Sequence, residues 1–476
     1  MIKVTTYKDK NVIVLGLGKT GQVAARALMA GGANVIVWDD SQSSLAQASV
    51  QGFTVADPSM FDWDNIDALL VSPGIPLNYP APHPLVENAR NLGVPIISDI
   101  DLLRTEQNQC KFIGITGTNG KSTTTSLIGH ILEQNYYEAA VGGNIGIAAL
   151  DLNPLTEEGF YVLELSSYQL DITKNLDLNA AILLNITPDH LKRHGNMMNY
   201  ANAKKNIFNF HKPGGLAVVG IDTPDSKNIY NSLLSSGHKN LVAITEKKPM
   251  KGAIYLSDGC IIDNAFADNE IAIDQLTFES IVPRQNFENL AAAYAVLRHF
   301  GLSRQMIVHS LKSFQSLAHR QELTARIDRI TFINDSKATN VPAVEQALKN
   351  YNNMYLILGG RSKGESLKPI IKYADKINHI FLIGEAADSF AVQLEDEISY
   401  TIVYNMEEAV NSARTMALNA PKSSPVVILS PACESYDQFN NFEHRGDTFK
   451  QIVANLPGLH QALPRNENNL QVLEIV

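Results

Sequence analysis

The segment 112–123, Phe-Ile-Gly-Ile-Thr-Gly-Thr-Asn-Gly-Lys-Ser-Thr, has the residue types and order of a phosphate-binding loop. An apolar run enters a glycine-rich stretch, and Lys121-Ser122 then opens a helical pattern. In such loops backbone amides surround phosphate oxygens, the lysine reaches the outer phosphates and the serine hydroxyl binds Mg²⁺. The segment departs from the strict Walker pattern, which has glycine at the position of Ile115. We still expect it to bind nucleotide phosphates.

Acidic and histidine side chains follow two later apolar runs. Glu164 lies in the run Tyr161–Leu165. A buried lone carboxylate is costly unless it is paired or bound to metal, so we interpret Glu164 as a Mg²⁺ ligand; the alternative is a hydrogen-bonded structural carboxylate. His190 and His194 have the i, i+4 spacing of some zinc sites. Because the glutamate of H-E-x-x-H is absent, we favour Mg²⁺ or substrate binding by His190.

Lysine residues interrupt the apolar face of a predicted helix around residue 200. A helical wheel places Lys204 in the middle of an apolar arc and Lys205 at its edge, the arc being Tyr200, Ala203, Ile207 and Phe208. A lysine there either extends its ammonium to solvent along the apolar surface or serves a site. Burial lowers a lysine pKa, and the neutral amine can react with CO₂ to give a carbamate. The residues alone leave both interpretations open.

A first glycine-rich loop follows the apolar run 12–15. Gly16, Gly18 and Gly21 fit G-x-G-x-x-G, and Asp39-Asp40 comes about twenty residues later, after the next apolar run. The pattern fits a dinucleotide, another pyrophosphate-containing nucleotide, or a tight turn without a ligand. A second loop, Ser72–Pro76, follows the third apolar run. There the alternative to a ligand contact is a plain Pro/Gly turn.

The elements that must position these residues are short apolar strands alternating with helical patterns. This order predicts α/β layers with largely parallel sheets. The length of 476 residues favours two to four domains, and we place the breaks near residues 100 and 317. The expected strands are Val12–Leu15, Val35–Trp38, Ala68–Val71, Ile96–Ser98, Phe112–Thr116, Tyr161–Leu165, Ala181–Asn185, Leu216–Val219, Leu241–Ile244, Ile330–Asn334, Tyr355–Leu358, Ile380–Ile383, Tyr400–Val403 and Val426–Leu429.

Composition and charge exclude several classes of protein. Hydrophobic residues make up 45% of the chain, which is ordinary for a globular protein. The net charge is −10, so we expect no non-specific binding to nucleic acid or to anionic membranes. The three cysteines, Cys110, Cys260 and Cys433, lack CxxC spacing and fit a reducing compartment. No apolar run approaches a transmembrane length, and Asp9 favours a first strand over a signal peptide.

Together these motifs resemble the Mur ligase family, in order and over nearly the whole chain. The matching segments are Gly117–Thr123, Leu163–Ser167, Asn185–His190, Ala203-Lys204, Asn286–Asn289, His319-Arg320, Asn334–Asn340 and Ser430–Ser435. Ser72–Pro76 and Asn334–Asn340 resemble the family members that add D-glutamate. Members that add L-alanine or diaminopimelate have histidine-containing segments in place of Asp335-Ser-Lys-Ala-Thr. A folate-using member would open with its ATP domain.

The resemblance implies an α/β fold of three domains. The N-terminal domain, residues 1–99, is Rossmann-like and binds the UDP part of a substrate. A central parallel-sheet domain of the P-loop ATPase type, residues 100–316, binds ATP. A Rossmann-like C-terminal domain, residues 317–476, binds ATP and D-glutamate. The first glycine loop is thereby assigned to UDP and not to NAD.

The resemblance also implies a role for individual residues. Those expected to bind the UDP-substrate are Gly18, Lys19, Thr20, Gly21, Asp39, Asp40, Ser72, Pro73, Gly74 and Asn144. Those expected to bind ATP are Gly117, Thr118, Asn119, Gly120, Lys121, Ser122, Thr123, Asn289, Arg320 and Asp335. Those expected to bind D-glutamate are Thr339, Lys363, Ser435 and Phe442, with Arg361 competing with Lys363 for the side-chain carboxylate.

The implied reaction is ATP-driven addition of D-glutamate to UDP-N-acetylmuramoyl-L-alanine in peptidoglycan precursor synthesis, through an acyl phosphate. Lys121, Asn144, His190 and Lys204 are its expected catalytic residues. One Mg²⁺ is expected on Ser122 and Glu164, and a second on His190 and carbamylated Lys204. The alternatives are a family ligase with another acceptor amino acid, or a non-catalytic nucleotide-binding protein. We expect a cytoplasmic monomer.

Overall fold

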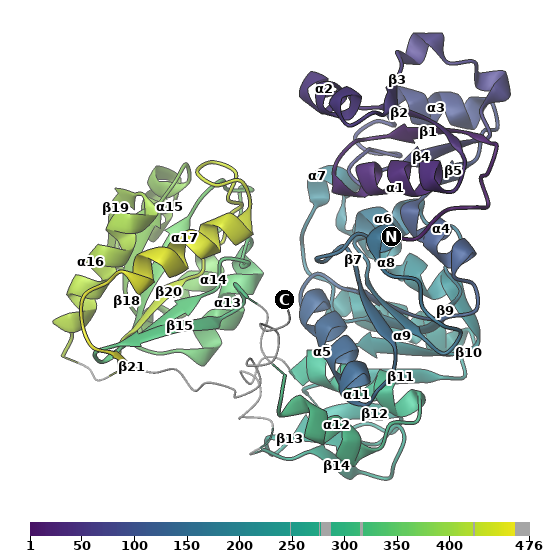
Figure 1. Ribbon diagram of the computed structural model, residues 1–476. Coiled ribbons are helices and arrows are strands. Elements are labelled where there is room, and N and C mark those ends of the chain that lie inside the picture. Colours follow the sequence, from purple (N-terminus) through teal and green to yellow (C-terminus); the bar gives the residue numbers. More distant parts are fainter. Residues whose placement is uncertain (248, 276, 278–286, 315–317, 422–423, 462–476) are drawn as a thin grey trace, which may run out of the picture. The chain divides into compact units, whose positions relative to one another are not determined.

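The computed structural model describes residues 1–461 apart from 248, 276, 278–286, 315–317 and 422–423. The chain divides into two compact units, the first containing the described residues up to Phe314 and the second those from Ala318 onward (Figure 1). Asn286 and the expected boundary at 316/317 lie outside the described residues. Among the described residues, no helix is both long and apolar enough to cross a bilayer.

The first unit begins with a five-stranded parallel sheet in the order β3-β2-β1-β4-β5. Every residue of β4 is buried, as expected for a strand with helices on both faces. The strands are β1 (Asn11–Leu15), β2 (Asn34–Trp38), β3 (Thr54–Val55), β4 (Ala68–Val71) and β5 (Ile96–Ile97), and the helices are α1 (Lys19–Ala30), α2 (Gln42–Val50) and α3 (Pro84–Asn91).

A nine-stranded sheet follows, in the order β14-β13-β12-β11-β10-β9-β6-β8-β7. Its strands are β6 (Lys111–Thr116), β7 (Ala139–Gly143), β8 (Phe160–Glu164), β9 (Leu178–Leu183), β10 (His211–Gly220), β11 (Leu241–Thr245), β12 (Ala253–Ser257), β13 (Cys260–Asp263) and β14 (Glu270–Ile273). β13 pairs antiparallel with β12 and β14, and the other pairings are parallel. The order places the carboxyl ends of β6, β8 and β9 side by side.

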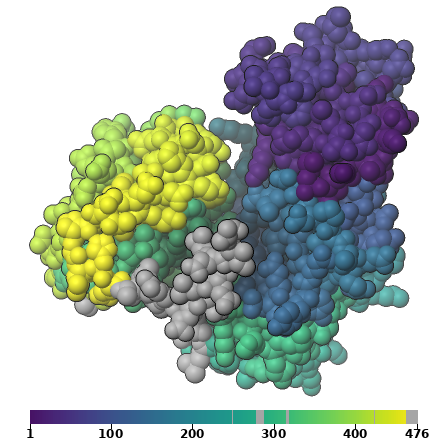
Figure 2. All heavy atoms as spheres, in the orientation of Figure 1, coloured from purple at the N-terminus to yellow at the C-terminus, as the bar shows by residue number. Residues whose placement is uncertain are grey.

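The helices of this part are α4 (Asp99–Glu106), α5 (Lys121–Gln134), α6 (Ser167–Ile172), α7 (Leu191–His194), α8 (Met197–Lys205), α9 (Pro224–Ser235), α11 (Phe287–His299) and α12 (Arg304–Leu311). In α5 the apolar face predicted from sequence, Leu127, Ile128, Ile131 and Leu132, is completely buried. One apolar core continues from the first sheet into this part of the unit. The space-filling view shows the purple N-terminal segment resting on the blue central segment (Figure 2).

The second unit contains a seven-stranded sheet in the order β19-β18-β17-β20-β16-β15-β21. Its strands are β15 (Glu322–Ile327), β16 (Ile330–Asn334), β17 (Met354–Gly359), β18 (Ile377–Ile383), β19 (Tyr400–Tyr404), β20 (Val426–Leu429) and β21 (His460–Gln461), and its helices are α13 (Val341–Asn350), α14 (Lys368–Ile371), α15 (Ala387–Leu394), α16 (Met406–Leu418) and α17 (Phe442–Ala454). The strands β16–β20 are parallel, and β15 is antiparallel to its neighbours.

Alternate residues of these strands point to opposite cores. Leu356 and Leu358 of β17 pack with α13 and α15, whereas Ile357 between them packs with α16 and α17. Cys433 is buried in the first of these cores, and all three cysteines are free thiols. The described residues therefore form three sheets, each packed with helices, and two of these sheets belong to the first unit.

Candidate active site

The predicted phosphate loop joins β6 to α5, at the carboxyl edge of the nine-stranded sheet. Gly120 caps α5 in the left-handed region at φ +85°, and a Cβ there would lie 2.1 Å from Oδ1 of Asn289. Glycine is therefore required at this position. Lys121 Nζ donates to the carbonyl oxygens of Gly117 and Thr118, both at 2.9 Å. Ser122 is buried at the start of the helix, where amides and dipole favour an anion.

The back of this loop is tied to the segment that follows β9. The Asn119 amide donates to Oδ1 of Asn185 at 2.9 Å, and Thr118 Oγ1 lies 3.0 Å from the Tyr200 hydroxyl. The Thr187 amide donates to Thr118 Oγ1 at 3.0 Å. These contacts fix Gly117, Thr118, Asn119 and Gly120 from behind, and Thr123 follows them in the first turn of α5.

Glu164 ends β8, beside β6, and is 3% exposed. Asn144, in the loop after β7, donates from Nδ2 to Oε1 of Glu164 at 2.8 Å, and its backbone amide donates to the Glu164 carbonyl at 2.9 Å. Two predicted site residues are thus in direct contact. A buried carboxylate held by an amide and next to Ser122's loop has the donor chemistry that Mg²⁺ prefers.

Lys204 is 2% exposed in α8, so the structure contradicts the interpretation that its ammonium extends to solvent. Its Nζ donates to the Gly117 carbonyl at 2.7 Å and lies 4.8 Å from the centre of the Tyr200 ring. Burial, followed by repulsion from Lys121, holds the pKa of Lys204 well below its ordinary value. The apolar arc around it, Tyr200, Ala203, Ile207 and Phe208, is buried as predicted.

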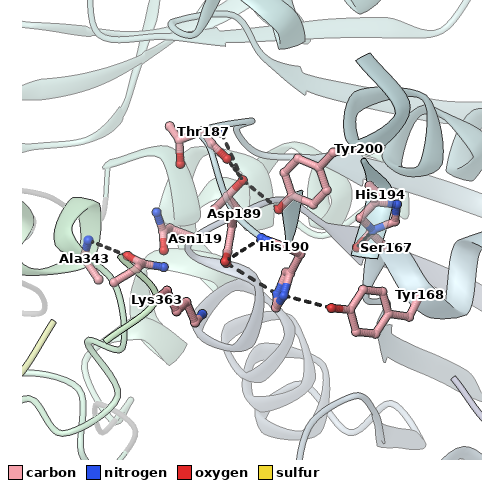
Figure 3. Close-up of polar contacts among 12 residues, drawn as sticks. Asn119, Ser167, Tyr168, Thr187, Asp189, His190, His194, Tyr200, Ala343 and Lys363 are labelled. Atoms are coloured by element: carbon pink, nitrogen blue, oxygen red, sulfur yellow. Dashed lines mark hydrogen bonds and ion pairs between the residues drawn. The ribbon is translucent and has the colours of Figure 1, made fainter. Parts of the chain in front are cut away.

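His190 lies just before α7 in a left-handed conformation, φ 54°. The Tyr168 hydroxyl is 3.0 Å from its Nδ1, and Asp189 contacts both its backbone amide and its ring (Figure 3). His194 is different: it is buried, its Nε2 lies 2.9 Å from Ser167 Oγ, and burial lowers its pKa to about 4. The two histidines therefore have separate polar partners, in keeping with the sequence argument against zinc.

The residues predicted to hold Mg²⁺ include only two carboxylate or imidazole groups, Glu164 and His190, besides Ser122 and Lys204. Within the described ranges, no group of three or more His, Cys, Asp or Glu side chains could hold a metal by itself. Mg²⁺ usually takes one or two carboxylates and completes its shell with water and substrate phosphates. The donor set therefore suits Mg²⁺ that arrives with a nucleotide.

The first glycine loop joins β1 to α1, as the sequence predicted. Ser72 Oγ donates to the Gly16 carbonyl at 2.6 Å, and a Cβ on Gly21 would lie 1.8 Å from that same oxygen. Asp39 accepts from the Leu17 amide at 2.6 Å, so it supports the loop directly. The other predicted residues of this site, Gly18, Lys19, Thr20, Asp40, Pro73 and Gly74, lie at least partly exposed at the same edge.

Two further contacts extend this site. Lys19 Nζ donates to the carbonyl of Gly146, in the loop that carries Asn144, and so connects the first sheet to the central one. Asp40 pairs with His83 at 3.2 Å. The first loop, Asn144 and Glu164 therefore all lie within one unit.

In the second unit, Asp335 follows β16 and is buried. It accepts hydrogen bonds from Ser430 Oγ at 2.7 Å and from the Gln321 amide at 3.1 Å. Burial raises its pKa to about 7, and nearby Arg320 acts in the opposite direction. Asp335 and Arg320, which are both predicted to bind ATP, thus lie near each other.

The residues predicted to bind D-glutamate lie on loops at the carboxyl end of this sheet. Lys363 Nζ is 3.6 Å from Glu434 Oε1, whereas Arg361 forms a two-pronged ion pair with Glu385 at 2.9 and 3.1 Å. Ser435 is buried near the end of the β20 loop. Thr339 precedes α13, and Phe442 opens α17 with Lys337 Nζ 3.6 Å from its ring centre.

Several residues that support the predicted site residues were not expected from the sequence. Tyr168 contacts His190, Glu288 contacts Asn185, and the buried Arg445 binds the carbonyl oxygens of Ser336 and Cys433 at 2.8 and 3.0 Å. Arg445 lies on the buried side of α17, a helix that the sequence analysis did not predict. For Tyr168 and Glu288, the sequence pattern does not indicate which residues their side chains contact.

Family models place the chain among proteins that share this combination of three α/β layers and a nucleotide loop. The Mur ligase MurD-like N-terminal domain matches residues 10–98, the Mur ligase middle domain 115–297, and the Mur ligase glutamate ligase domain 319–433. The protein therefore belongs to the Mur ligase family, as the sequence motifs indicated.

Named relatives resemble the chain over almost its full length. A UDP-N-acetylmuramoylalanine--D-glutamate ligase from Paramagnetospirillum magneticum is 45% identical, covering 95% of this chain and 98% of the relative. The protein of that name from Caulobacter vibrioides is 42% identical, covering 96% and 98%.

Solved structures agree with the fold. MurF from Acinetobacter baumannii has a TM-score of 0.59 at 16% identity, covering 95% of this chain and 93% of that one. UDP-N-acetylmuramate-alanine ligase from Thermotoga maritima has a TM-score of 0.57 at 16% identity, covering 94% and 99%. At these identities the structural likeness concerns only the α/β fold with its three sheets.

Proposed function

We propose that the protein is an ATP-dependent ligase that joins D-glutamate to UDP-N-acetylmuramoyl-L-alanine in peptidoglycan precursor synthesis. Relatives named for this activity are 40–45% identical over 95–96% of the chain. The structural observation that carries the proposal is a pair of lysines on one carbonyl. Lys121 and Lys204 both donate to the Gly117 oxygen, at 2.9 and 2.7 Å.

A second buried lysine beside a phosphate-binding lysine needs a chemical reason. Burial and the Lys121 charge lower the pKa of Lys204, and this raises the fraction of its amine that is in the neutral form. The neutral nitrogen attacks CO₂, loses a proton and becomes a carbamate, which turns a cation into an anionic metal ligand. We propose that carbamylated Lys204 and His190 serve one Mg²⁺, and that Ser122 and Glu164 serve another.

Bound Mg²⁺ would neutralise the phosphate charge that develops during transfer. Lys121 leaves the loop carbonyls to reach the outer phosphates, while the loop amides hold the rest of the triphosphate. The substrate carboxylate attacks the γ-phosphorus, and ADP leaves. The neutral amine of D-glutamate then attacks the acyl phosphate carbonyl, loses a proton, and phosphate leaves as the amide forms.

We propose that residues of the second unit bind D-glutamate, the acceptor amino acid, and part of ATP. Lys363 is the proposed partner of the side-chain carboxylate of D-glutamate, because its contact with Glu434, at 3.6 Å, is longer than the two-pronged ion pair between Arg361 and Glu385. Asp335 and Arg320 serve the ATP side of that unit. All three reactants are small molecules, and we propose that the enzyme uses them in the cytoplasm as a monomer, which sedimentation would check.

The test is ATP-dependent phosphate release with UDP-N-acetylmuramoyl-L-alanine and a panel of acceptors: D-glutamate, L-glutamate, L-alanine and meso-diaminopimelate. We expect release above background with D-glutamate alone, and none when the UDP-substrate is omitted. Faster release with another amino acid would assign a different ligase of the same family. No release with any acceptor, together with retained ATP binding, would point to a non-catalytic nucleotide-binding protein.

A further inference from the structure

Glu288 is a carboxylate behind the phosphate loop that the proposed mechanism does not use. It lies in the first turn of α11, and its Oε2 accepts from Asn185 Nδ2 at 2.6 Å. A Cβ on Gly220, at the end of β10, would lie 2.1 Å from its Oε1. The chain therefore leaves room for this carboxylate between the ends of two strands.

The side-chain oxygen and nitrogen of Asn185 both form hydrogen bonds with neighbouring groups. Its Oδ1 accepts from the Asn119 amide at 2.9 Å, and its Nδ2 donates to the Asn119 carbonyl at 3.2 Å as well as to Glu288. A side-chain amide has one oxygen acceptor and two N–H donors. Glu288 takes the second donor and so selects the orientation in which the Asn185 oxygen faces the Asn119 amide.

A reversed Asn185 amide would direct an NH₂ group at the Asn119 N–H, donor against donor. Asn119 lies directly before Gly120, whose left-handed conformation turns the chain into α5. The shape of the phosphate loop therefore depends on the orientation of one side-chain amide. That orientation depends in turn on an acceptor at position 288.

We propose that Glu288 is a positioning residue for ATP binding, acting through Asn185 to hold the phosphate loop in its binding shape. The inference rests on the proposed function in so far as the loop's ligand is ATP. Glu288 acts from behind the loop and touches no reacting atom. Its effect is therefore expected on nucleotide affinity and not on the chemical steps.

Charge and hydrogen bonding can be separated at this position. Burial above all raises the pKa of Glu288 to about 7; the Asn185 hydrogen bond acts against this shift, and repulsion from Asp222 and Glu246 acts with it. The groups that face it are thus carboxylates and the Asn185 amide, and a neutral acceptor would serve the same purpose. Glutamine at 288 keeps an oxygen acceptor for Asn185 Nδ2, whereas alanine removes it.

The experiment measures binding of Mg²⁺ with a non-hydrolysable ATP analogue by calorimetry, and steady-state KM for ATP and kcat. For Glu288→Ala we expect Kd and KM to rise roughly 3- to 20-fold, the value of a lost hydrogen bond, with kcat within about twofold. Glu288→Gln should restore affinity to within about twofold. Glu133→Ala, an exposed carboxylate on α5, is the control.

A double-mutant cycle with Asn185→Ala tests the route of the effect. If Glu288 acts through Asn185, adding Glu288→Ala to Asn185→Ala should change Kd little further. Unchanged affinity in Glu288→Ala, an equally weak Glu288→Gln, or additive losses in the cycle would overturn the proposal. The binding measurement needs no UDP-substrate or amino acid, so failure of the proposed ligase activity would leave it readable.

Discussion

The buried amine of Lys204 is the residue on which the proposed chemistry depends most. We expect Lys204→Ala to lower turnover by about 10²- to 10³-fold, the usual effect of removing one preorganised electrostatic group, while ATP binding is largely kept. Short carboxylates such as formate or acetate should restore part of the activity, because they can replace the carbamate. Phosphate release with and without added carboxylate is the measurement.

Lys205 provides a matched control for this prediction. It is one residue further along α8 and its Nζ lies 3.4 Å from Ser232 Oγ, away from the Gly117 carbonyl. Lys205→Ala should therefore keep turnover. Equal losses in the two variants, or full activity in Lys204→Ala, would remove the carbamate from the mechanism.

Lys363 and Arg361, on loops of the second unit, have different ion-pair partners, and we expect them to contribute differently to binding of D-glutamate. Lys363→Ala should raise KM for D-glutamate about 10- to 100-fold, the value of a lost hydrogen bond to a charged group. Arg361→Ala should raise it less than about threefold, because exposed ion pairs such as Arg361–Glu385 contribute little. KM for ATP is the internal control. A larger effect from Arg361→Ala would exchange the two assignments.

The site was partly visible in the sequence, to a degree that varied with the kind of residue. Lys121, Ser122 and Gly120 belong to a local loop whose geometry depends on nearby residues, so their spacing predicted their place. The contact between Asn144, in the loop after β7, and Glu164, at the end of β8, was not predicted; only the family resemblance had assigned Asn144 to the site. Whether Lys204 was buried could not be decided from the helical wheel, since a long side chain on an apolar face can reach solvent or stay inside.

At the scale of elements, α4 begins with an unusual buried acid. Asp99, its first residue, is 3% exposed, and its Oδ1 has no hydrogen-bond partner among the residues that the structure describes. Desolvation raises its pKa to about 7, in spite of the favourable helix terminus. The preceding Ser98 forms a capping box with Asp101, which fixes this turn in place.

This shift makes stability depend on pH in a defined direction. Between the unfolded pKa of 3.8 and the folded value of about 7, the folded state binds more protons than the unfolded state. The contribution of Asp99 to the free energy of unfolding therefore falls as pH rises through this window. Asp99→Asn, which carries no charge, should match wild type near pH 4 and gain roughly 1–3 kcal/mol by pH 8.

Urea unfolding at the two pH values, followed by hydrogen exchange of α4 amides, measures this difference. Asp151→Asn, an exposed carboxylate in the same unit, should show no such gain. If Asp99→Asn were instead less stable at pH 8 than at pH 4 relative to wild type, the carboxylate would be stabilised by its surroundings and the stated cause would be wrong.

Most strands were predictable because buried parallel strands are continuous apolar runs. β1, β4, β6 and β20 lie where the pattern put them. The strands that escaped prediction include β7, Ala139–Gly143, which ends in two glycines, and the short strands β13 and β14, which have mixed exposure. Such strands form because a neighbouring strand offers hydrogen bonds, which a single segment of sequence does not reveal.

For the whole molecule, the net charge of −10 must be reconciled with substrates that are all anionic. We propose that local groups do this: helix termini, Lys19, Lys121, Arg320 and Lys363, together with metal. We expect chelation by EDTA to abolish phosphate release and added Mg²⁺ to restore it. The melting temperature should stay within about 2 °C, because the described residues contain no self-sufficient metal cluster whose loss would unfold them.

Calorimetry with and without EDTA, in parallel with the activity assay, checks both halves of this prediction. A large fall in melting temperature would mean that metal is part of the fold. Retained phosphate release after chelation would mean that the cations of the chain neutralise the phosphates by themselves. Either result would contradict the division of labour proposed between Mg²⁺ and the lysines.

The crowding around the Gly16 carbonyl has a consequence for how this fold can diverge. Gly21 and Ser72 both press against that oxygen, so any side chain at position 21 would collide with backbone before a ligand arrived. Helix–strand packing thus requires the third glycine of the G-x-G-x-x-G fingerprint, whichever nucleotide the loop binds. A lineage could exchange one nucleotide for another here by altering exposed neighbours such as Lys19, while the fingerprint itself stayed unchanged.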